Sequence, residues 1–430
     1  MTMKKMIFRA ALLAVALTAM MSSCQCGKNP EELHKKRDVM LFYVAGYNDL
    51  GTPYLQPDIE DLVGCNYLPG NAEDEDVVLV FSKIAKTSAD FTTPVQPVIF
   101  RIYKDKKGQT VCDTLKRWEP SVLASSASGV RDVLTFVKNS FPARSYGMVF
   151  SSHATGWVPE GYYSHPTGDA VPLSVGKKTS GIYRKEQLPG MPAVKSVGRE
   201  YTGTVLHEID IQDFADAIPY KLDYLLMDAC LMGGVETAWA LRGKTRLYGG
   251  SQTEVLADGF NYTTLTQWLC SPEEPDPLGV CTDYFTQYDQ RTGINRSATF
   301  SLIDCDKLDA LGTVCQDLFP RYRDAINALA PSAVQGYGRY HNSAEHPWYF
   351  DLQDILVQAG AANADLQALK QALDACVLYN AATPAFLKDY GGFDIRTHCG
   401  LSMYLPSAGN ATLNAFYKKL AWNQAAKLVE

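Results

Sequence analysis

The chain has 430 residues, of which 46% are hydrophobic and 20% charged, a composition that suits one large core or two moderate ones and excludes disordered and fibrous proteins. Lysine and arginine total 40 against 47 aspartates and glutamates, which gives a formal net charge of -7. This acidic balance, without a long basic run, argues against nucleic acid as a partner.

The first residues have the order of an export signal. Basic residues precede an apolar stretch at 10–21, which at twelve residues is too short to span a bilayer as a helix. Small residues and Cys24 follow this stretch. Residues 1–23 therefore resemble a bacterial lipoprotein signal peptide, whose cysteine becomes the mature N-terminus and carries the acyl chains.

This signal predicts where the protein resides. With Cys24 lipidated, we expect a protein anchored in the cell envelope, periplasmic or exposed at the surface, with residues 24–37 as a polar tether between membrane and domain. Met21 stands where Leu is usual, so an ordinary cleaved secretory signal is the alternative. Both interpretations predict an exported chain.

Seven short apolar runs are typical of buried strands, and they lie at 38–45, 76–84, 98–103, 146–151, 222–227, 246–251 and 298–303. Between them, three segments have apolar residues at helical spacing, at 128–139, 209–218 and 234–242. The alternation of strand and helix predicts an α/β domain over 38–303, with a mostly parallel sheet flanked by helices.

The chain changes character after the last of these strands. Helical patterns at 308–328 and 362–378, with one strand-like run at 400–405, predict a smaller, mainly helical unit over 304–430 that completes the fold. The interval 159–203 also stands apart, because its 45 residues are rich in Gly, Pro, Ser and Lys and exceed an ordinary connection. We expect it to be an excursion or a labile loop.

Two of the predicted strands end in reactive residues. The run 146–151 leads into His153, and the run 222–227 leads into Cys230. Reactive groups of an open parallel sheet collect at the carboxyl ends of its strands, so the two side chains face each other if these strands are neighbours. An imidazole beside a thiol, with a helix beginning just after the cysteine, suits nucleophilic acyl transfer. The alternative is that both residues only pack in the core.

The eleven cysteines are odd in number and scattered, without C-x2-C pairs or histidines at zinc spacing. A disulfide scaffold is therefore not expected. Export permits one or two disulfides, but the spacing identifies no pair. Most of the cysteines are predicted to be small buried apolar residues.

His153 lies in the motif S-x-H-x-x-G-W at the end of one predicted strand, and Cys230 lies in the motif D-A-C-L-M-G-x-x-E that follows another. This pair of motifs is similar to the signature of the clostripain family of cysteine peptidases, whose core has the caspase-like fold. Further blocks follow in the family's order, at 250–254, 258–262, 350–354 and 400–406. The resemblance extends from about Asp38 to the C-terminus.

The resemblance implies a cysteine endopeptidase in which Cys230 is the nucleophile and His153 the general base, working as a dyad. The oxyanion would be held by the backbone N–H groups of Cys230 and of Ala154 or its neighbour. Ala154 and Phe260 depart from the family, which usually has glycine and tryptophan at these positions.

Family members cleave after basic residues, so the implied partners are peptides or proteins with Arg or Lys before the scissile bond. A buried cation needs a carboxylate at the bottom of its pocket. Asp258 is the favoured candidate and Asp228 the second. A turn role for Asp258 and a strand-end or orienting role for Asp228 are the alternatives. Glu236 is expected to pair locally.

No cofactor is expected, because the sequence has no Gly-rich phosphate loop and His207 lacks the second histidine of a zinc helix. Some family members need calcium, for which the acidic run 73–76 is the candidate. A solvated loop is the favoured interpretation of that run.

The interval 159–203 is also predicted to be a substrate of the enzyme itself, as clostripain relatives mature by self-cleavage. It contains six basic residues: Lys177, Lys178, Arg184, Lys185, Lys195 and Arg199. An uncut loop over the site would keep the enzyme inactive until export is complete. An inert surface insertion is the alternative.

A second function, from another class, stays open. A surface lipoprotein of the same fold could bind peptides or partners without cutting them, and the variant residue Ala154 is the feature that favours this. Hydrolysis of a peptide substrate would separate the two functions.

Overall fold

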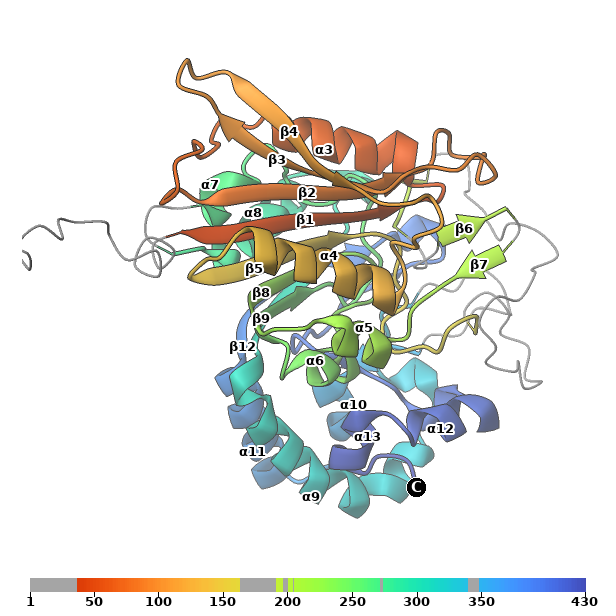
Figure 1. The fold of residues 1–430 in the computed structure, drawn as a ribbon. Coiled ribbons are helices and arrows are strands. Elements are labelled where there is room, and N and C mark those ends of the chain that lie inside the picture. The colour runs from red at the N-terminus through yellow and green to blue at the C-terminus, as the bar shows by residue number, and fades with distance from the viewer. Residues whose placement is uncertain (1–36, 163–190, 196–199, 204, 271–273, 339–347) are drawn as a thin grey trace, which may run out of the picture.

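A nine-stranded sheet with the order β12-β10-β9-β8-β5-β1-β2-β3-β4 forms the centre of the molecule (Figure 1). This computed structural model describes residues 37–162, 191–195, 200–203, 205–270, 274–338 and 348–430. The predicted signal peptide with Cys24, nearly all of the tether and most of the interval 159–203 lie outside the described residues. The strands of the sheet are β1 (Asp38–Gly46), β2 (Val77–Ile84), β3 (Val98–Lys104), β4 (Thr110–Arg117), β5 (Ser145–Ser151), β8 (Leu222–Asp228), β9 (Thr245–Gly250), β10 (Thr299–Asp304) and β12 (Val377–Ala382).

The five central strands run parallel. β1 pairs with β2 and β5, and β8 pairs with β5 and β9, all in parallel register. At the two edges, β3, β4, β10 and β12 pair antiparallel. Every residue of β1 is buried, as expected for a strand that is covered on both faces. The predicted α/β fold is confirmed, and all seven predicted strands are present.

Helices cover both faces of the sheet (Figure 1). On one face lie α4 (Ala127–Ser140), α5 (Ile211–Ala217) and α6 (Val235–Leu241), and on the other α3 (Gln56–Val63), α7 (Leu265–Leu269) and α8 (Pro277–Asp289). The α4 helix begins after Ser126, whose side chain accepts the N–H of Gly129 and caps the helix. Its buried residues recur at helical spacing, at Val130, Val133, Leu134 and Val137.

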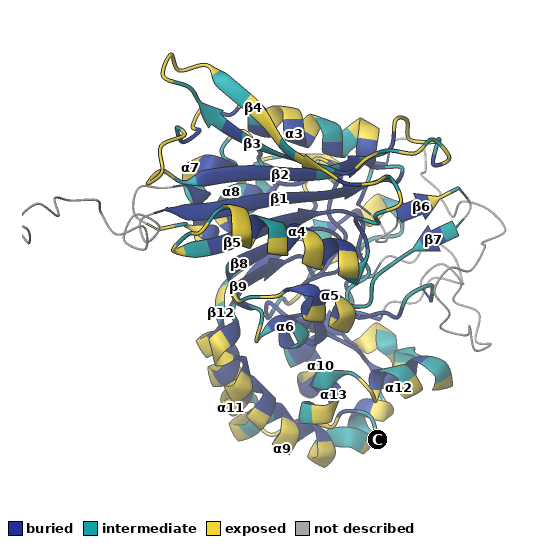
Figure 2. Ribbon diagram, viewed as in Figure 1, coloured by how far each residue is buried: buried dark blue, intermediate teal, exposed yellow. Residues whose placement is uncertain are grey.

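The C-terminal part packs onto the same core. Its helices are α9 (Leu308–Asn327), α10 (Leu352–Gln358), α11 (Asn363–Cys376), α12 (Ala411–Tyr417) and α13 (Ala421–Ala426). One hydrophobic cluster extends from Val39 to Leu428, and β12 completes the edge of the central sheet. Figure 2 shows exposed residues along α9 and α11 on the side away from this core. The mainly helical C-terminal unit is therefore built onto the α/β core.

The remaining elements are two-stranded pairs and single turns outside the central sheet. Two-stranded pairs are formed by β6 (Glu200–Thr202) with β7 (Val205–His207), β11 (Phe350–Asp351) with β15 (Ser402–Met403), and β13 (Ala385–Phe386) with β14 (Phe393–Asp394). Single turns are η1 (Gly51–Leu55), η2 (Gly293–Asn295), η3 (Cys305–Lys307), η4 (Pro331–Ala333), η5 (Lys388–Tyr390) and η6 (Pro406–Ala408). None of the helices within the described ranges combines the length and hydropathy that crossing a bilayer requires.

The described cysteines behave as the sequence predicted. Eight of the nine cysteines in the described ranges are buried, and Cys112 is exposed. Burial raises the pKa of several of these thiols, Cys281 and Cys399 among them, so they are inert at neutral pH.

Candidate active site

His153 and Cys230 leave the sheet at the carboxyl ends of two adjacent parallel strands. Ser151, the last residue of β5, pairs with Asp228, the last residue of β8, so each reactive residue follows its strand end by two positions. Neighbouring strands lie about 4.8 Å apart. The strands β5 and β8 are therefore neighbours, as is required for His153 and Cys230 to face each other.

The loops that follow these two strands touch each other. A Cβ added at Gly156 would lie 2.5 Å from the carbonyl oxygen of Leu231, so only glycine permits this approach. Leu231 itself has a φ of 62°, in the left-handed region that residues with a side chain rarely adopt. Backbone strain of this kind clusters at functional sites, and here it directly follows Cys230.

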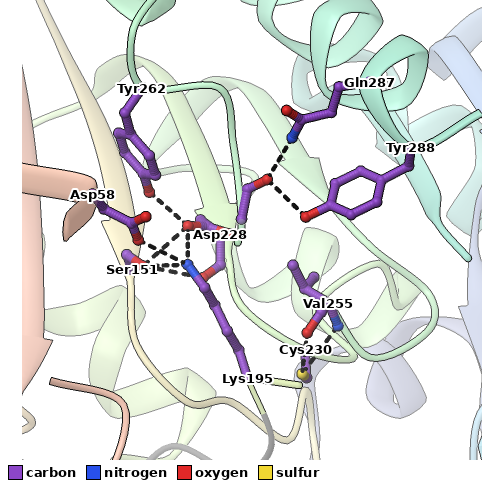
Figure 3. A network of polar contacts seen from close by, with 10 residues as sticks. Asp58, Ser151, Lys195, Asp228, Cys230, Val255, Tyr262, Gln287 and Tyr288 are labelled. Atoms are coloured by element: carbon purple, nitrogen blue, oxygen red, sulfur yellow. Dashed lines mark hydrogen bonds and ion pairs between the residues drawn. The ribbon is translucent and has the colours of Figure 1, made fainter. Parts of the chain in front are cut away.

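The thiol of Cys230 is fully buried and lies against a neighbouring loop. Its sulfur accepts a hydrogen bond from the N–H of Val255 at 3.1 Å (Figure 3). The thiol can also donate to the carbonyl oxygen of Val255, at 3.9 Å. The N–H donor stabilises a thiolate, whereas burial and the carbonyl oxygen favour the neutral thiol. The α6 helix begins only at Val235, so its N-terminus is farther from the thiol along the chain than the sequence suggested.

The imidazole of His153 is held by a carboxylate. Its Nε2 lies 3.0 Å from Oδ1 of Asp49, in the loop that follows β1. The side chain of His153 is 3% exposed and that of Asp49 is 38% exposed. The other ring nitrogen, Nδ1, is buried and has no hydrogen-bond partner among the described residues.

A lysine from the excursion points into a buried acidic pocket beside these loops (Figure 3). The ammonium group of Lys195 contacts Asp228, and it lies 3.3 Å from Oδ2 of Asp58 and 3.1 Å from Oγ of Ser151. Tyr262 donates a hydrogen bond to Asp228 at 2.5 Å. The three acceptors match the three N–H donors of an ammonium group, and Lys195 is fully buried.

The charges in this pocket are coupled. Burial on its own lowers the pKa of Lys195, but the charges and hydrogen bonds of Asp228 and Asp58 outweigh it, and the pKa is raised. Burial raises the pKa of Asp58 to about 7, although the charge of Lys195 opposes this. The pocket therefore stabilises the cation of Lys195.

The segment that carries Lys195 lies along the 255–257 segment like an added strand. The N–H of Lys195 donates to the carbonyl oxygen of Val255 at 2.8 Å, and the N–H of Ala257 donates to that of Ala193 at 2.8 Å. Val194 and Leu256 form an antiparallel bridge. An extended peptide on a free edge is a common mode of peptide recognition, with backbone bonds for affinity and side-chain pockets for specificity.

Asp258, the favoured pocket residue from the sequence, lies elsewhere. Its side chain is 60% exposed and pairs with Arg291 at 2.8 Å. The next residue faces the pocket instead, because a Cβ added at Gly259 would lie 2.4 Å from Asp228 and 2.5 Å from Nζ of Lys195. Gly259 has a φ of +60°, which suits glycine. The turn borders the pocket through its glycine, and its aspartate faces solvent.

The remaining sequence blocks converge on the loop of Cys230. Nε2 of Gln252 donates to the carbonyl oxygens of Gly233 and Gly400, at 3.2 and 2.8 Å. The N–H of Ser402 also donates to Gly233, at 3.0 Å. These contacts, from Gln252 after the end of β9 and from Ser402 in β15, fix the loop between Cys230 and α6.

Glu236 does not pair locally as expected. Its Oε1 accepts hydrogen bonds from the N–H of Tyr404 at 2.8 Å and from the hydroxyl of Tyr417 at 2.7 Å, so it joins α6 to the C-terminal part. These contacts fix the helix that follows the loop of Cys230.

The sequence did not identify Asp49, Asp58 or the particular lysine of the excursion. Asp49 contacts His153 across 104 positions of sequence, and Asp58 contacts Lys195 across 137. The contacts of Lys195 with Ser151 and Asp228 cross 44 and 33 positions. Asp49 follows a buried strand, as His153 and Cys230 do, and this position is the signal that could have identified it. Asp58 lies within a helix and carries no such signal.

No group of three or more His, Cys, Asp or Glu side chains in the described ranges is arranged to hold a metal ion. Within the acidic run 73–76, Asp76 accepts the N–H of Asp38 at 2.8 Å and Glu75 accepts that of Ala72 at 2.9 Å. These contacts test neither the expected absence of a cofactor nor the calcium alternative.

Comparison with known proteins gave one matching family and several solved structures of similar fold. Residues 198–428 match the sequence model of the clostripain family. No curated protein matches the chain. The structure of an inactive zymogen of a C11 protease from Parabacteroides distasonis is similar over 91% of this chain and 98% of that chain, with 24% identity and a TM-score of 0.70.

A secreted C11 cysteine protease from Bacteroides thetaiotaomicron is similar over 91% of this chain and 99% of that chain, with 22% identity and a TM-score of 0.69. Its complex with an irreversible peptide inhibitor gives 20% identity, the same coverage and a TM-score of 0.69. These likenesses agree with the caspase-like fold that was predicted.

Proposed function

The chain belongs to the clostripain family of cysteine peptidases, and we propose that it is an exported, lipid-anchored endopeptidase that cleaves after Lys or Arg with a Cys230–His153 dyad. One observation carries the proposal. Lys195 of the same chain is bound in a buried acidic pocket, and its backbone is paired as that of an extended peptide substrate would be.

The dyad is supported by the positions of its members at adjacent strand ends. His153 takes the proton of the Cys230 thiol, and the thiolate attacks the carbonyl carbon before the scissile bond. The oxyanion accepts hydrogen bonds from the N–H groups of Cys230 and of Ala154 or its neighbour. His153 then protonates the leaving amine, and water hydrolyses the thioester.

Specificity for a basic residue is assigned to Asp228, with Asp58 as its partner. The sequence favoured Asp258 for this role, and we now propose Asp228 instead. An exposed carboxylate that already pairs with Arg291 adds little to the binding free energy of a desolvated cation. The three acceptors around the ammonium group of Lys195 favour Lys over Arg, whose planar guanidinium has five donors in a fixed fork.

The bound lysine also supports self-cleavage of the excursion. Lys195 occupies the pocket that a substrate needs, so the uncut chain is its own competitor for the site. The proposed cut is the bond between Lys195 and Ser196. Cutting it gives the upstream segment a new end that can leave the pocket, and we propose that this is the step that activates the enzyme.

Anchoring in the envelope is proposed from the sequence alone, through lipidation of Cys24. A Cys24→Ala variant should leave the membrane fraction. Fractionation of this variant with lipid would overturn the anchor without affecting the peptidase proposal.

The peptidase is tested with purified wild type, Cys230→Ala and His153→Ala on peptides with Lys, Arg or Asp before the reporter group. Wild type should hydrolyse the Lys and Arg peptides, and both variants should be inactive. Cys281→Ala is the matched control, since Cys281 is a buried thiol in α8 and its loss should leave the rate unchanged.

Two results would overturn the proposal. Full activity of either dyad variant would exclude the assigned mechanism. A wild type that binds Lys peptides but never hydrolyses them, even after cleavage of the excursion, would favour the alternative of a peptide-binding surface lipoprotein.

A further inference from the structure

We propose that Asp49 is a positioning residue that holds His153 in the tautomer and orientation required by the thiol, so that the site works with three side chains. The inference rests on the proposed Cys230–His153 dyad and adds the carboxylate that orients the histidine ring. Asp49 acts through His153 and touches neither the substrate nor the sulfur in this role.

The fold brings Asp49 to His153 through adjacent strands. β1 pairs in parallel with β5, with Val44 opposite Ser151, so the loops after both strands leave the same edge of the sheet. Ser152 donates a hydrogen bond to the carbonyl oxygen of Ala45 at 2.8 Å, which ties the histidine loop to the end of β1.

The loop that carries Asp49 is fixed by its own hydrogen bonds. Nδ2 of Asn48 donates to the carbonyl oxygen of Ala45 at 3.0 Å, and its Oδ1 accepts the N–H of Leu50 at 3.0 Å. Asn48 is fully buried, whereas the carboxylate of Asp49 reaches over to His153. A carboxylate on a fixed loop can orient a ring, because neither partner needs to be ordered when the substrate arrives.

The chemistry follows from which ring nitrogen is engaged. An ionised carboxylate only accepts hydrogen bonds, so Nε2 of His153 must carry the proton in the contact with Asp49. The neutral ring then has its lone pair on Nδ1, which is buried and has no partner among the described residues. This is the nitrogen left to take the proton of the Cys230 thiol.

The contact between His153 and Asp49 is a poor candidate for an ion pair that only stabilises the fold. Exposed ion pairs contribute little to the free energy of unfolding, and here the histidine side chain is 3% exposed and the aspartate side chain 38% exposed. The ring is desolvated, while the carboxylate can still be reached from solvent. Removal of the carboxylate should therefore leave a site that a small carboxylate ion can enter.

The test uses the full chain with Asp49→Ala, Asp49→Asn and, as control, Glu60→Ala, an exposed carboxylate on α3. Because slow variants would also mature slowly, each protein is first cut in the excursion with limited trypsin, checked by intact mass, and freed of trypsin activity by an inhibitor. Hydrolysis of a Lys peptide is then measured with and without sodium formate, and unfolding by urea is recorded for each protein.

We expect kcat of Asp49→Ala to fall about 100-fold with KM within about threefold, and formate to restore a substantial part of the loss. Asp49→Asn should be as slow, because its amide can donate to Nε2 and favour the wrong tautomer, and formate should not help it. Glu60→Ala should match wild type with and without formate.

Two outcomes would overturn the role of Asp49. One is a kcat of Asp49→Ala within twofold of wild type, and the other is a loss that formate does not reverse. His153→Ala in the same assay separates this failure from that of the dyad. If His153→Ala is inactive while Asp49→Ala is fully active, only the inference on Asp49 fails; if His153→Ala is active, the dyad fails first.

Discussion

In the described part of the excursion, two buried ion-pair sites connect it to the core, and the lysine belongs to the excursion in one and to the core in the other. In the first, the excursion supplies the lysine, Lys195, and the end of β8 supplies the carboxylate, Asp228. In the second, the excursion supplies the carboxylate, Glu200, and β2 supplies the lysine, Lys83, with 2.5 Å between the charged atoms. All four side chains are at most 3% exposed.

The two pairs differ in what else holds them. The ammonium group of Lys83 also donates to the carbonyl oxygens of Pro120 and Val122, at 3.1 and 2.7 Å, and Glu200 accepts the N–H of Ser125 at 2.9 Å. The neighbouring Tyr201 stacks on Phe91. These contacts need this particular segment and no other peptide.

The segment of Lys195 is held by two backbone hydrogen bonds to the 255–257 segment and by the acidic pocket, and any extended peptide with a basic side chain could make these contacts. The buried side chain of Val194 adds an apolar contact with the core. The proposed cut after Lys195 falls between the two pairs. Under the proposed cleavage, a substrate would replace the upstream end in the pocket, while the buried pair of Glu200 and Lys83 would keep the downstream end in place.

Removal of the positive charge of Lys195 should have the largest effect, on cleavage of the excursion. Lys195→Met should abolish cutting of the bond between residues 195 and 196, because a thioether gives Asp228 and Asp58 no positive charge. Lys195→Arg should still be cut, at a lower rate. Intact mass over time, with fragments assigned to the bond, measures this; unchanged cutting of that bond in Lys195→Met would show that the pocket does not select the site.

The pair of Lys83 and Glu200 should control stability. Lys83→Met leaves the buried carboxylate of Glu200 uncompensated, and we expect the free energy of unfolding to fall by about 3–5 kcal/mol. The double variant with Glu200→Leu should recover most of this loss, since neither charge is then buried. Urea unfolding measures both.

The control for this prediction is an exposed pair of the same type. Lys388 pairs with Asp394, and both side chains are more than half exposed. Lys388→Met should therefore lower the free energy of unfolding by less than about 1 kcal/mol. If Lys83→Met costs no more than this control, burial does not distinguish the two pairs.

A third buried carboxylate extends the comparison, because its hydrogen-bond donors are neutral. Burial raises the pKa of Glu236 to about 7, against an ordinary value of 4.5, while the donors Tyr404 and Tyr417 oppose this rise. As pH increases from about 4.5 to 7, the unfolded chain loses this proton before the folded protein does. The free energy of unfolding therefore falls over this window, by about 3 kcal/mol.

Glu236→Gln tests this effect, because glutamine does not titrate and keeps an acceptor for Tyr404. The difference in unfolding free energy between variant and wild type, measured in urea at pH 5 and pH 8, should shift in favour of the variant by about 3 kcal/mol at the higher pH. Equal pH dependence of the two proteins would contradict the assignment.

The sequence predicted the central sheet because its strands are buried on both faces and read as continuous apolar runs. It missed β4 and β12, which are edge strands with polar or exposed residues. The helix α8 was also missed, although Asp276 caps it and Pro277 begins it. Edge strands are fixed by their neighbours, and this information is not local.

The parts of the candidate site that depend on local sequence could also be predicted. Positions at strand ends and family blocks are features of the sequence, and they brought His153 and Cys230 to one edge. The pocket residues could not be ranked in this way, because burial decides between Asp228 and Asp258 and burial depends on the whole fold.

We therefore expect substitution of Asp258 to change activity and stability least among these variants. Asp258 and Asp228 both lie near Gly259, but only Asp228 faces the lysine. Asp258→Ala should change kcat/KM for a Lys peptide by less than about twofold and stability by less than about 1 kcal/mol, because it removes an exposed pair with Arg291. Asp228→Ala should lower kcat/KM for the same peptide at least about 100-fold, by leaving the substrate's buried cation without its main carboxylate. Parallel kinetics on Lys and Arg peptides would decide the assignment. A large loss in Asp258→Ala with little change in Asp228→Ala would mean that substrates bind by the surface turn, and that the pocket holding Lys195 serves only to keep the uncut chain closed.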